Sequence, residues 1–151
     1  MDTLFPASLR QRDTFALIKL AALIRQECAD KLAPTGLNQN QHAILCCLDE
    51  FGPACQKDIA VRLGIDSGDI VAFIDGLQAK GLLERRRDER DRRRQILTIT
   101  PQGSRVLGEV EDLFTEAESG LLGVLSQADR ETLHDSALRV LAAQAPESWL
   151  E

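Results

Sequence analysis

Long apolar runs are missing from this chain, and none approaches the roughly 20 residues that a helix needs to cross a bilayer. The first residues also lack the basic segment and apolar core of a secretory signal. Histidine is scarce, with only His42 and His134, and the four cysteines show neither zinc-ligand spacing nor a secreted disulfide pattern. We therefore expect a cytoplasmic protein with reduced cysteines and without a membrane span, bound metal or cofactor.

Catalytic patterns are also missing. The sequence contains no Ser-His-Asp or Cys-His arrangement and no phosphate-binding glycine loop, and its carboxylates lie at ordinary helical surface spacing. We therefore do not expect an enzyme. An apolar fraction of 44% and a charged fraction of 28% suit a folded core with a solvated surface. The 151 residues fit one compact domain with helices added to form a subunit interface.

Positive charge is scarce overall and concentrated in one segment. The net charge of −6 disfavours a DNA-binding protein at first, because Lys and Arg supply most affinity for phosphates. Residues 85–94, however, read Arg-Arg-Arg-Asp-Glu-Arg-Asp-Arg-Arg-Arg, which gives a local charge of +4. This segregation suits a protein that presents one cationic feature to a polyanion while the rest of its surface is acidic.

The first predicted element is one long helix from residue 9 to about residue 32. Apolar residues recur there at helical spacing, without an internal Gly or Pro. They cover more than one narrow stripe, so we expect burial on two sides, against the helix's own domain and against a second subunit. Pro34 and Gly36 end the helix.

Three shorter helices are expected next. Asn38 is placed to cap the first of them. The second begins near Gln56 and ends at Gly64, and the third follows with Asp66 as its cap and ends at Gly81. Two short helices joined by a turn that contains glycine are typical of a helix-turn-helix, in which the second is the recognition helix.

A short β-hairpin is expected after residue 81. Residues 82–86 and 95–100 are short, and the second stretch alternates β-branched residues with Thr. The arginine-rich stretch lies between them, so about residues 87–94 would form a charged wing beside the recognition helix. Pro101 then opens a fifth helix and Ser126 caps a sixth, and both are expected to pair with the first helix.

Together these elements predict a mainly α (α+β) fold, a winged helix-turn-helix with long terminal helices. Residues 1–36 would form an N-terminal dimerisation helix, residues 37–100 the winged helix-turn-helix, and residues 101–151 the C-terminal dimerisation helices.

Several motifs in this order resemble the MarR family of bacterial regulators, over roughly residues 10–145. Residues 37–45 resemble the family's Leu-Thr-x-x-Gln-aromatic-x-x-Leu opening of the second helix, with Asn and His in place of Thr and the aromatic residue. Residues 58–65 and 74–85 are similar to the helix before the recognition turn and to the passage into the wing. The most specific match is residues 87–103, which are close to the family's Arg-x-x-Asp-Pro-x-Asp-x-Arg wing and its Leu-Thr-x-x-Gly continuation, with Glu89 replacing Pro.

The resemblance implies a homodimeric transcriptional regulator that binds a pseudo-palindromic double-stranded DNA site. As a repressor it would be released by a small aromatic or anionic effector. It also implies that Arg93, with Arg92 beside it, reaches the minor groove while Asp91 helps to hold the loop. Arginine can read the shape of a narrow minor groove without contacting base edges. The candidate DNA-binding residues of the wing are Arg87, Arg90, Asp91, Arg92, Arg93 and Arg94.

The recognition helix departs from the family pattern, because many members carry Ser, Thr and Arg where residues 66–72 read Asp-Ser-Gly-Asp-Ile-Val-Ala. Asp66 and Asp69 either accept hydrogen bonds from cytosine or only cap the helix. The candidate contacts are Ser67, Gly68, Asp69, Val71 and Ala72.

Arg12, Arg25 and His42 are candidates for an effector pocket between the DNA-binding and dimerisation parts. Surface salt bridges and a partly exposed polar histidine explain these three residues as well. The cysteines are either small core residues or redox sensors, and the candidates are Cys28, Cys46, Cys47 and Cys55.

Two other functions remain open at this point. One is a winged-helix adaptor whose arginine loop meets an acidic protein, which the acidic recognition helix favours. The other is a regulator that senses oxidants through its cysteines.

Overall fold

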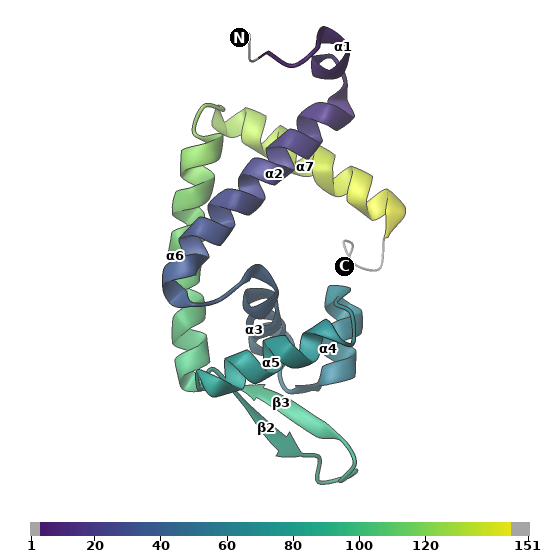
Figure 1. The fold of residues 1–151 in the computed structure, drawn as a ribbon, viewed down its shortest axis with the longest axis vertical. Coiled ribbons are helices and arrows are strands. Elements are labelled where there is room, and N and C mark those ends of the chain that lie inside the picture. Colours follow the sequence, from purple (N-terminus) through teal and green to yellow (C-terminus); the bar gives the residue numbers. More distant parts are fainter. Residues whose placement is uncertain (1–3, 146–151) are drawn as a thin grey trace.

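A computed structural model describes residues 4–145 and places them in two connected parts (Figure 1). Residues 1–3 and 146–151, the ends of the predicted terminal segments, lie outside the described residues. The elements are α1 (Ala7–Arg10), α2 (Asp13–Leu32), η1 (Ala33–Thr35), α3 (Gln39–Phe51), β1 (Ala54–Cys55), α4 (Gln56–Leu63), α5 (Asp69–Ala79), β2 (Leu83–Arg87), β3 (Gln95–Ile99), α6 (Pro101–Leu122) and α7 (Gln127–Gln144). The predicted mainly helical fold with a small sheet is confirmed.

One part is a lobe of α3, α4, α5 and the sheet, and the other consists of α1, α2, α6 and α7. In Figure 1 the long helix α6 runs from the base of the sheet, beside α3, to the far end of the molecule. Helix α2 packs along α6, and α7 turns back across the far end. The chain connects the lobe to the terminal helices at two places, where η1 leads into α3 and where β3 leads into α6, and α6 also packs against α3.

The sheet has three antiparallel strands in the order β1-β3-β2. Leu83 pairs with Ile99 at the base of the β2–β3 hairpin, and Arg87 pairs with Gln95 near its tip. Strand β1 was not predicted from the sequence. Its two residues, Ala54 and Cys55, are too few to show a strand period, and pairing with β3 defines it.

The lobe folds around one apolar core. Apolar residues of α3, α4 and α5 are buried in it and meet β2, β3 and α6, whereas Phe51 at the end of α3 is exposed. The largest fully buried side chains are Leu32, Ile44, Leu45, Leu48, Ile59, Ile70, Ile74, Leu77, Leu83, Leu97 and Val110.

The prediction of one continuous helix from residue 9 is wrong at its start, because Gln11 and Arg12 separate α1 from α2. The break follows from local contacts. The Arg10 side chain donates from Nε to the carbonyl oxygen of Phe5 at 2.9 Å, and the Phe5 ring packs edge-on against Phe15 with centroids 5.2 Å apart. These contacts fold the chain back on the start of α2. The predicted end is confirmed, since Pro34 lies in η1 and Gly36 adopts a φ of 71°.

Two predicted helix caps are confirmed. The Asn38 side chain accepts from the backbone nitrogen of Gln41 at 2.9 Å, and the Gln41 side chain accepts from the Asn38 nitrogen at 3.2 Å. This reciprocal pair is a capping box. Ser126 accepts from the Asp129 nitrogen at the start of α7.

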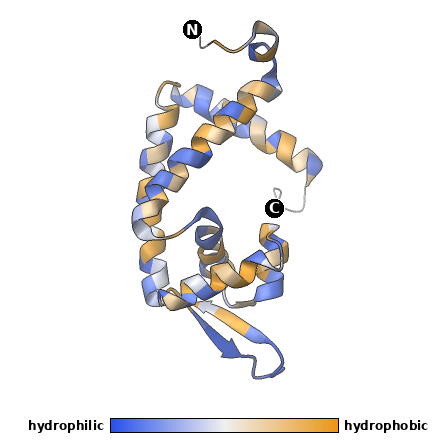
Figure 2. Ribbon diagram, in the orientation of Figure 1, coloured by the Kyte–Doolittle hydropathy of each residue, from blue (hydrophilic) through white to orange (hydrophobic). Residues whose placement is uncertain are grey.

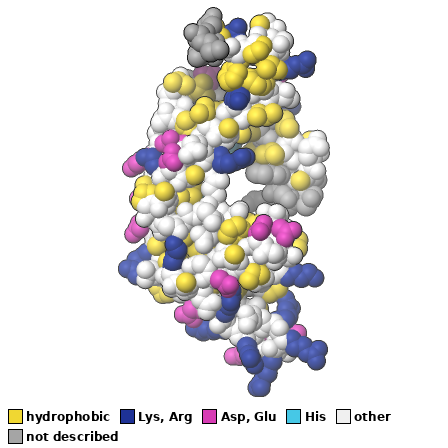
Figure 3. Space-filling view, in the orientation of Figure 1, with side chains coloured by type: hydrophobic (Ala, Val, Ile, Leu, Met, Phe, Trp, Pro, Cys, Tyr) yellow, Lys and Arg dark blue, Asp and Glu magenta, His cyan; other side chains and the backbone are white. Residues whose placement is uncertain are grey.

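The terminal helices leave much apolar surface in water. Helix α2 buries only Leu32, and α7 buries no residue. Figure 3 shows apolar side chains gathered over α1 and α2, away from the lobe, and Figure 2 shows the hydrophobic residues of these helices on the ribbon. The exposed large apolar residues on α1, α2, α7 and the segment before α1 are Leu4, Phe5, Leu9, Leu17, Ile18, Leu23, Ile24, Val140 and Leu141. Among the described residues, no helix is long and apolar enough to cross a membrane.

Candidate nucleic-acid interface

The wing is residues 88–94 with the adjoining ends of β2 and β3, and its loop is held by its own two aspartates. Across the loop the Asp88 nitrogen donates to the Arg94 carbonyl oxygen at 3.0 Å. The Asp88 carboxylate accepts from the Arg90 nitrogen at 2.9 Å, and the Asp91 carboxylate accepts from the Arg93 nitrogen at 3.0 Å. Asp91 therefore caps the backbone turn that leads to Arg93. Each aspartate fixes a backbone turn, so the arginines between them project from an ordered loop.

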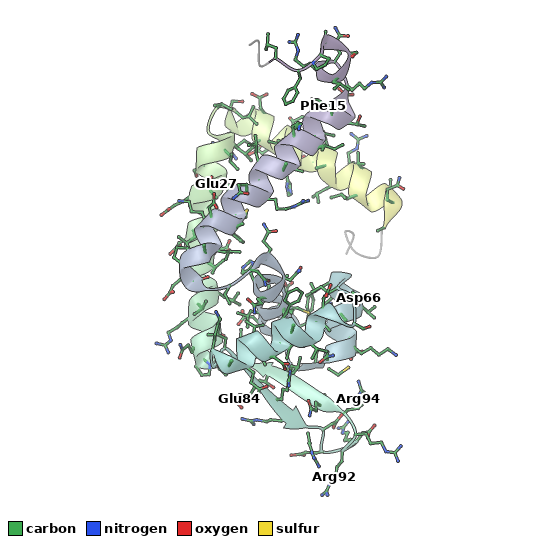
Figure 4. All side chains as sticks on the ribbon, viewed as in Figure 1. Phe15, Glu27, Asp66, Glu84, Arg92 and Arg94 are labelled. Carbon is green, nitrogen blue, oxygen red and sulfur yellow. The ribbon has the colours of Figure 1, made fainter. Side chains whose placement is uncertain are left out.

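Four wing arginines are solvent-exposed, and within residues 4–145 none of their guanidinium groups forms an ion pair. These four, named here the free wing arginines, are Arg87, Arg90, Arg92 and Arg93. Figure 3 shows their positive charge gathered at the end of the molecule formed by the hairpin, and in Figure 4 Arg92 extends away from the body. Unpaired guanidinium groups are available to phosphates or to a groove.

Arg94 differs from this group because its guanidinium has partners within the protein. In the structure its guanidinium donates to the Cys55 sulfur at 3.3 Å and lies 3.5 Å from the Asp58 carboxylate. The physical reason is the register of β3, which places Arg94 beside β1 and the start of α4. Arg94 therefore joins the base of the wing to the lobe.

Two arginines of β2 are also paired within the protein. Arg85 forms an ion pair with Asp75 of α5, and Arg86 lies 2.8 Å from Glu84 on its own strand. The first pair joins the wing to the outward side of α5 and neutralises a carboxylate there. The sequence analysis did not select Asp75 or Arg85.

The structure places α5 as the recognition helix of the helix-turn-helix, with its first turn set by Asp66. The Asp66 carboxylate accepts from the Gly68 nitrogen at 2.8 Å, and its carbonyl oxygen accepts from the nitrogens of Asp69 and Ile70, both at 3.1 Å. Asp66 thus organises the entry to the helix. The helix itself begins at Asp69, later than predicted, and Gly68 precedes it without a side-chain cap.

All five recognition-helix candidates face solvent, while Ile70, Ile74 and Leu77 point into the core. Helical spacing extends the same outward face to Asp75 and Gln78, both exposed. Sequence reasoning missed these two, although their positions four and seven residues after Val71 could have identified them. Residues 66–79 contain no Lys or Arg, so the positive charge of the interface comes from the wing.

Two contacts fix α5 to the rest of the molecule. Gln41, 8% exposed, donates from its side-chain nitrogen to the Phe73 carbonyl oxygen at 3.3 Å. Lys80, directly after α5, donates from Nζ to the Gly36 carbonyl oxygen at 2.5 Å. The recognition helix is therefore fastened to the cap of α3 at one point and to the end of η1 at the other.

The three candidate effector residues do not meet in one pocket. Arg12 and Arg25 lie at the start and in the middle of α2, roughly 20 Å apart along its axis. His42 is half-buried in α3, edge-on to the Phe114 ring with centroids 4.8 Å apart, and its Nε2 lies 3.4 Å from the Cys46 sulfur. Burial lowers the pKa of His42, and the charge of Glu111 acts against this effect.

A shallow, mostly apolar groove of about 450 Å³ lies instead between α4 and the first turn of α5. None of the predicted effector residues lines it. Its lining residues are Gln56, Lys57, Ala60, Val61, Gly64, Ile65, Ser67 and Ile70.

All four cysteines are free thiols in the structure. Burial is the largest cause that raises the pKa of Cys28, Cys46 and Cys47. A raised pKa lowers the thiolate fraction and so disfavours reaction with oxidants. Within residues 4–145, no cluster of three or more metal-ligating side chains is present.

A helix-turn-helix followed by a hairpin that projects free arginines beside the recognition helix defines a winged helix-turn-helix protein. Comparison with known proteins agrees with this class. The family model described as MarR family matches residues 37–94. The structure of the transcriptional repressor CouR, bound to a 23-mer DNA duplex, superposes with a TM-score of 0.83 and 28% identity, over 93% of this chain and 99% of that chain.

Curated relatives give the same assignment. The helix-turn-helix regulator YwoH of Bacillus subtilis is 29% identical over 111 residues, which cover 74% of this chain and 80% of YwoH. A proposed transcriptional regulatory protein for the hcr operon of Thauera aromatica is 35% identical over 112 residues, which cover 74% of this chain and 68% of that protein. The chain belongs to the MarR family of DNA-binding transcriptional regulators and is not an enzyme.

Proposed function

We propose that the chain acts as a homodimeric repressor on a pseudo-palindromic DNA site. In this proposal α5 of each protomer lies in the major groove. Arg92 and Arg93 of each wing reach the adjacent minor groove, where an A·T-rich sequence concentrates negative potential. Phosphate contacts position the dimer. Repression follows because a dimer that covers a promoter excludes polymerase, and the similar protein CouR is described as a repressor.

The observation that carries the proposal is the set of four free wing arginines on an ordered loop. The chain has a net charge of −6, so carboxylates are plentiful, yet within residues 4–145 these four guanidinium groups have no carboxylate partner. A surface that binds another protein does not require cations to be left unpaired in this way. A polyanion supplies the missing partners, and its released counterions favour binding.

A second copy of the chain is proposed as the partner of the terminal helices. A 20-residue helix that buries one residue and an 18-residue helix that buries none leave their apolar side chains without a core. Helices α1, α2 and α7 and the far end of α6 lie at the end of the molecule opposite the wing (Figure 1), so that a two-fold partner there leaves both wings free. This arrangement supports the predicted division into dimerisation segments and a DNA-binding segment.

A small aromatic or anionic effector is proposed to release the dimer from DNA. The half-buried His42 and Phe114 join α3 of the lobe to α6 of the terminal helices, so a ligand beside them contacts both parts. Such a ligand shifts the equilibrium only if it binds the free and DNA-bound arrangements with different affinity.

Binding to mixed genomic DNA fragments at several salt concentrations tests the proposal. A DNA-binding regulator retains particular fragments and loses them steeply as salt rises, and sequencing of the retained fragments identifies its site. Failure to retain any fragment, while binding an acidic protein, would instead support the adaptor. The acidic α5 favours that alternative, but the Asp75 carboxylate is already paired with Arg85.

A redox regulator is the other alternative, and the raised pKa values of three cysteines speak against it. Loss of DNA binding on mild peroxide treatment, restored by a thiol reductant, would support it.

A further inference from the structure

Two adjacent apolar side chains, named here the apolar step, lie on the outward face of α5. This is an unusual place for apolar side chains in a helix that lies in a DNA groove. Val71 is 42% exposed and Ala72 is exposed, and helical spacing places Ala72 opposite the buried Ile70 and Ile74 with Val71 on the flank beside it. Neither residue belongs to the hydrophobic core of the described residues, 4–145. Both lie in the first turn of α5, shortly after Ser67 and Gly68, which precede the helix.

The side chains around this step limit how α5 can read bases. A guanine is most often read by an arginine or lysine that donates to its O6 and N7 atoms, and residues 66–79 contain neither. One oxygen of Asp75 is already paired with Arg85, and the exposed Gln78 lies near the far end of α5, away from its first turn. The chemistry left to short apolar side chains in the major groove is contact with the C5 methyl group of thymine.

We propose that Val71, with Ala72 beside it, reads thymine methyl groups in the major groove of the DNA site. This inference rests on the proposed function, because it requires α5 to enter that groove. The wing contributes positive charge that attracts the DNA but does not distinguish one base from another. The apolar step distinguishes thymine from other bases but contributes no charge. The two surfaces therefore divide affinity and sequence preference between them.

The fixed position of α5 makes this reading specific. Gln41 holds the Phe73 carbonyl oxygen, one residue after Ala72, and the Arg85–Asp75 pair holds the next turn from the other side. A helix fastened on both sides of Val71 cannot roll to bring another face to the bases. Its apolar step therefore meets the same base positions in each complex.

The test uses the shortest genomic duplex that the full chain retains, with each thymine replaced singly by deoxyuridine. This change removes one methyl group and leaves base pairing intact. For the parent, at least one replacement in each half-site is expected to weaken binding about fourfold, the factor for taking one methyl group out of apolar contact.

The protein side of the test is Val71→Ser, with Val124→Ser as its matched control. Val124 is 90% exposed between α6 and α7, so that substitution makes the same chemical change far from α5. The deoxyuridine effect is expected to disappear in Val71→Ser and to remain fourfold in Val124→Ser. Circular dichroism of both variants verifies that they fold as the parent does.

Two results would overturn the inference. One is a parent that binds the duplex but is indifferent to every thymine methyl group. The other is an undiminished deoxyuridine effect in Val71→Ser. A parent that retains no duplex at all overturns the proposed function itself, together with this inference, so the two failures are distinguishable.

Discussion

Replacing Arg92 and Arg93 by alanine in the full chain is expected to flatten the salt dependence of DNA binding. Their guanidinium groups extend from the wing without a carboxylate partner, so each one that meets the duplex releases counterions from it. The double substitution removes this contribution and leaves the Asp88 and Asp91 hydrogen bonds that shape the loop.

The magnitude follows from the number of free wing arginines. Four in each protomer give a dimer about eight contacts and a log–log salt slope of about −7, since each contact contributes about −0.9. Between about 50 and 200 mM salt, the parent should lose about 10⁴-fold in affinity. The variant dimer keeps about four contacts, so its slope should be about −3.6 and its loss about 10²-fold.

Fluorescence anisotropy with a labelled duplex measures the slope, and sedimentation velocity verifies that the variant is still a dimer. Arg105→Ala with Arg139→Ala is the control, because it removes the same charge from exposed positions of α6 and α7 and should leave the slope unchanged. A double wing variant with the parental slope would refute the assignment of these arginines to the DNA interface. Equal flattening by the control would show a general effect of net charge instead.

Three further outcomes test the fold and its titrating groups. Gly103→Ala should lower the free energy of unfolding by about 1–3 kcal/mol in urea titrations, because the new Cβ collides with the Leu82 carbonyl group and Ile99. In Gly108→Ala, in the same helix, the new Cβ meets open space, so this substitution should raise the free energy of unfolding by roughly 0.5–1 kcal/mol. Equal effects of the two substitutions would contradict the close packing at Gly103. Burial lowers the pKa of His42 from 6.5, so the folded chain binds fewer protons than the unfolded chain between those pKa values. Stability should therefore fall as pH drops from about 7.5 to about 5, and His42→Gln should weaken this trend; an unchanged trend would refute the role of burial. The three cysteines with raised pKa should react with a disulfide reagent at neutral pH more slowly than free cysteine does, and equal rates would contradict their burial.

Most of the fold could be predicted because local chemistry determines its boundaries. Asn38 and Ser126 cap their helices with side chains that are visible in the sequence. Gly36 and Gly64 adopt the left-handed conformation that ends a helix, with φ values of 71° and 63°. The free wing arginines were predicted for a similar reason, since a run of cations on a hairpin loop has few neighbours that could pair with it.

The remaining features depend on contacts between distant residues. Arg94 and Arg93 are adjacent in sequence, yet only Arg94 reaches Asp58, which lies 36 positions earlier. The break before α2 depends on where the Phe5 ring lies, and no periodicity reports this. The effector candidates were selected by residue type and by an expected pocket between the two parts, and their separation along α2 and α3 depends on packing that the sequence does not show.

Contacts within the lobe indicate how a ligand at the terminal helices would reach the DNA. Gln41 fastens α5 to α3, and Arg94 fastens the wing to α4. Thr100, at the start of α6, donates from its hydroxyl to the Gly81 carbonyl oxygen at 2.7 Å, which ties the end of α5 to the last strand. A body fastened at these points moves as a unit, so under the proposed function an effector cannot reshape α5 alone. Under that proposal it tilts each lobe together with the first half of α6, which packs into the lobe through Val110, and the separation of the two wings is the quantity that then changes on the duplex.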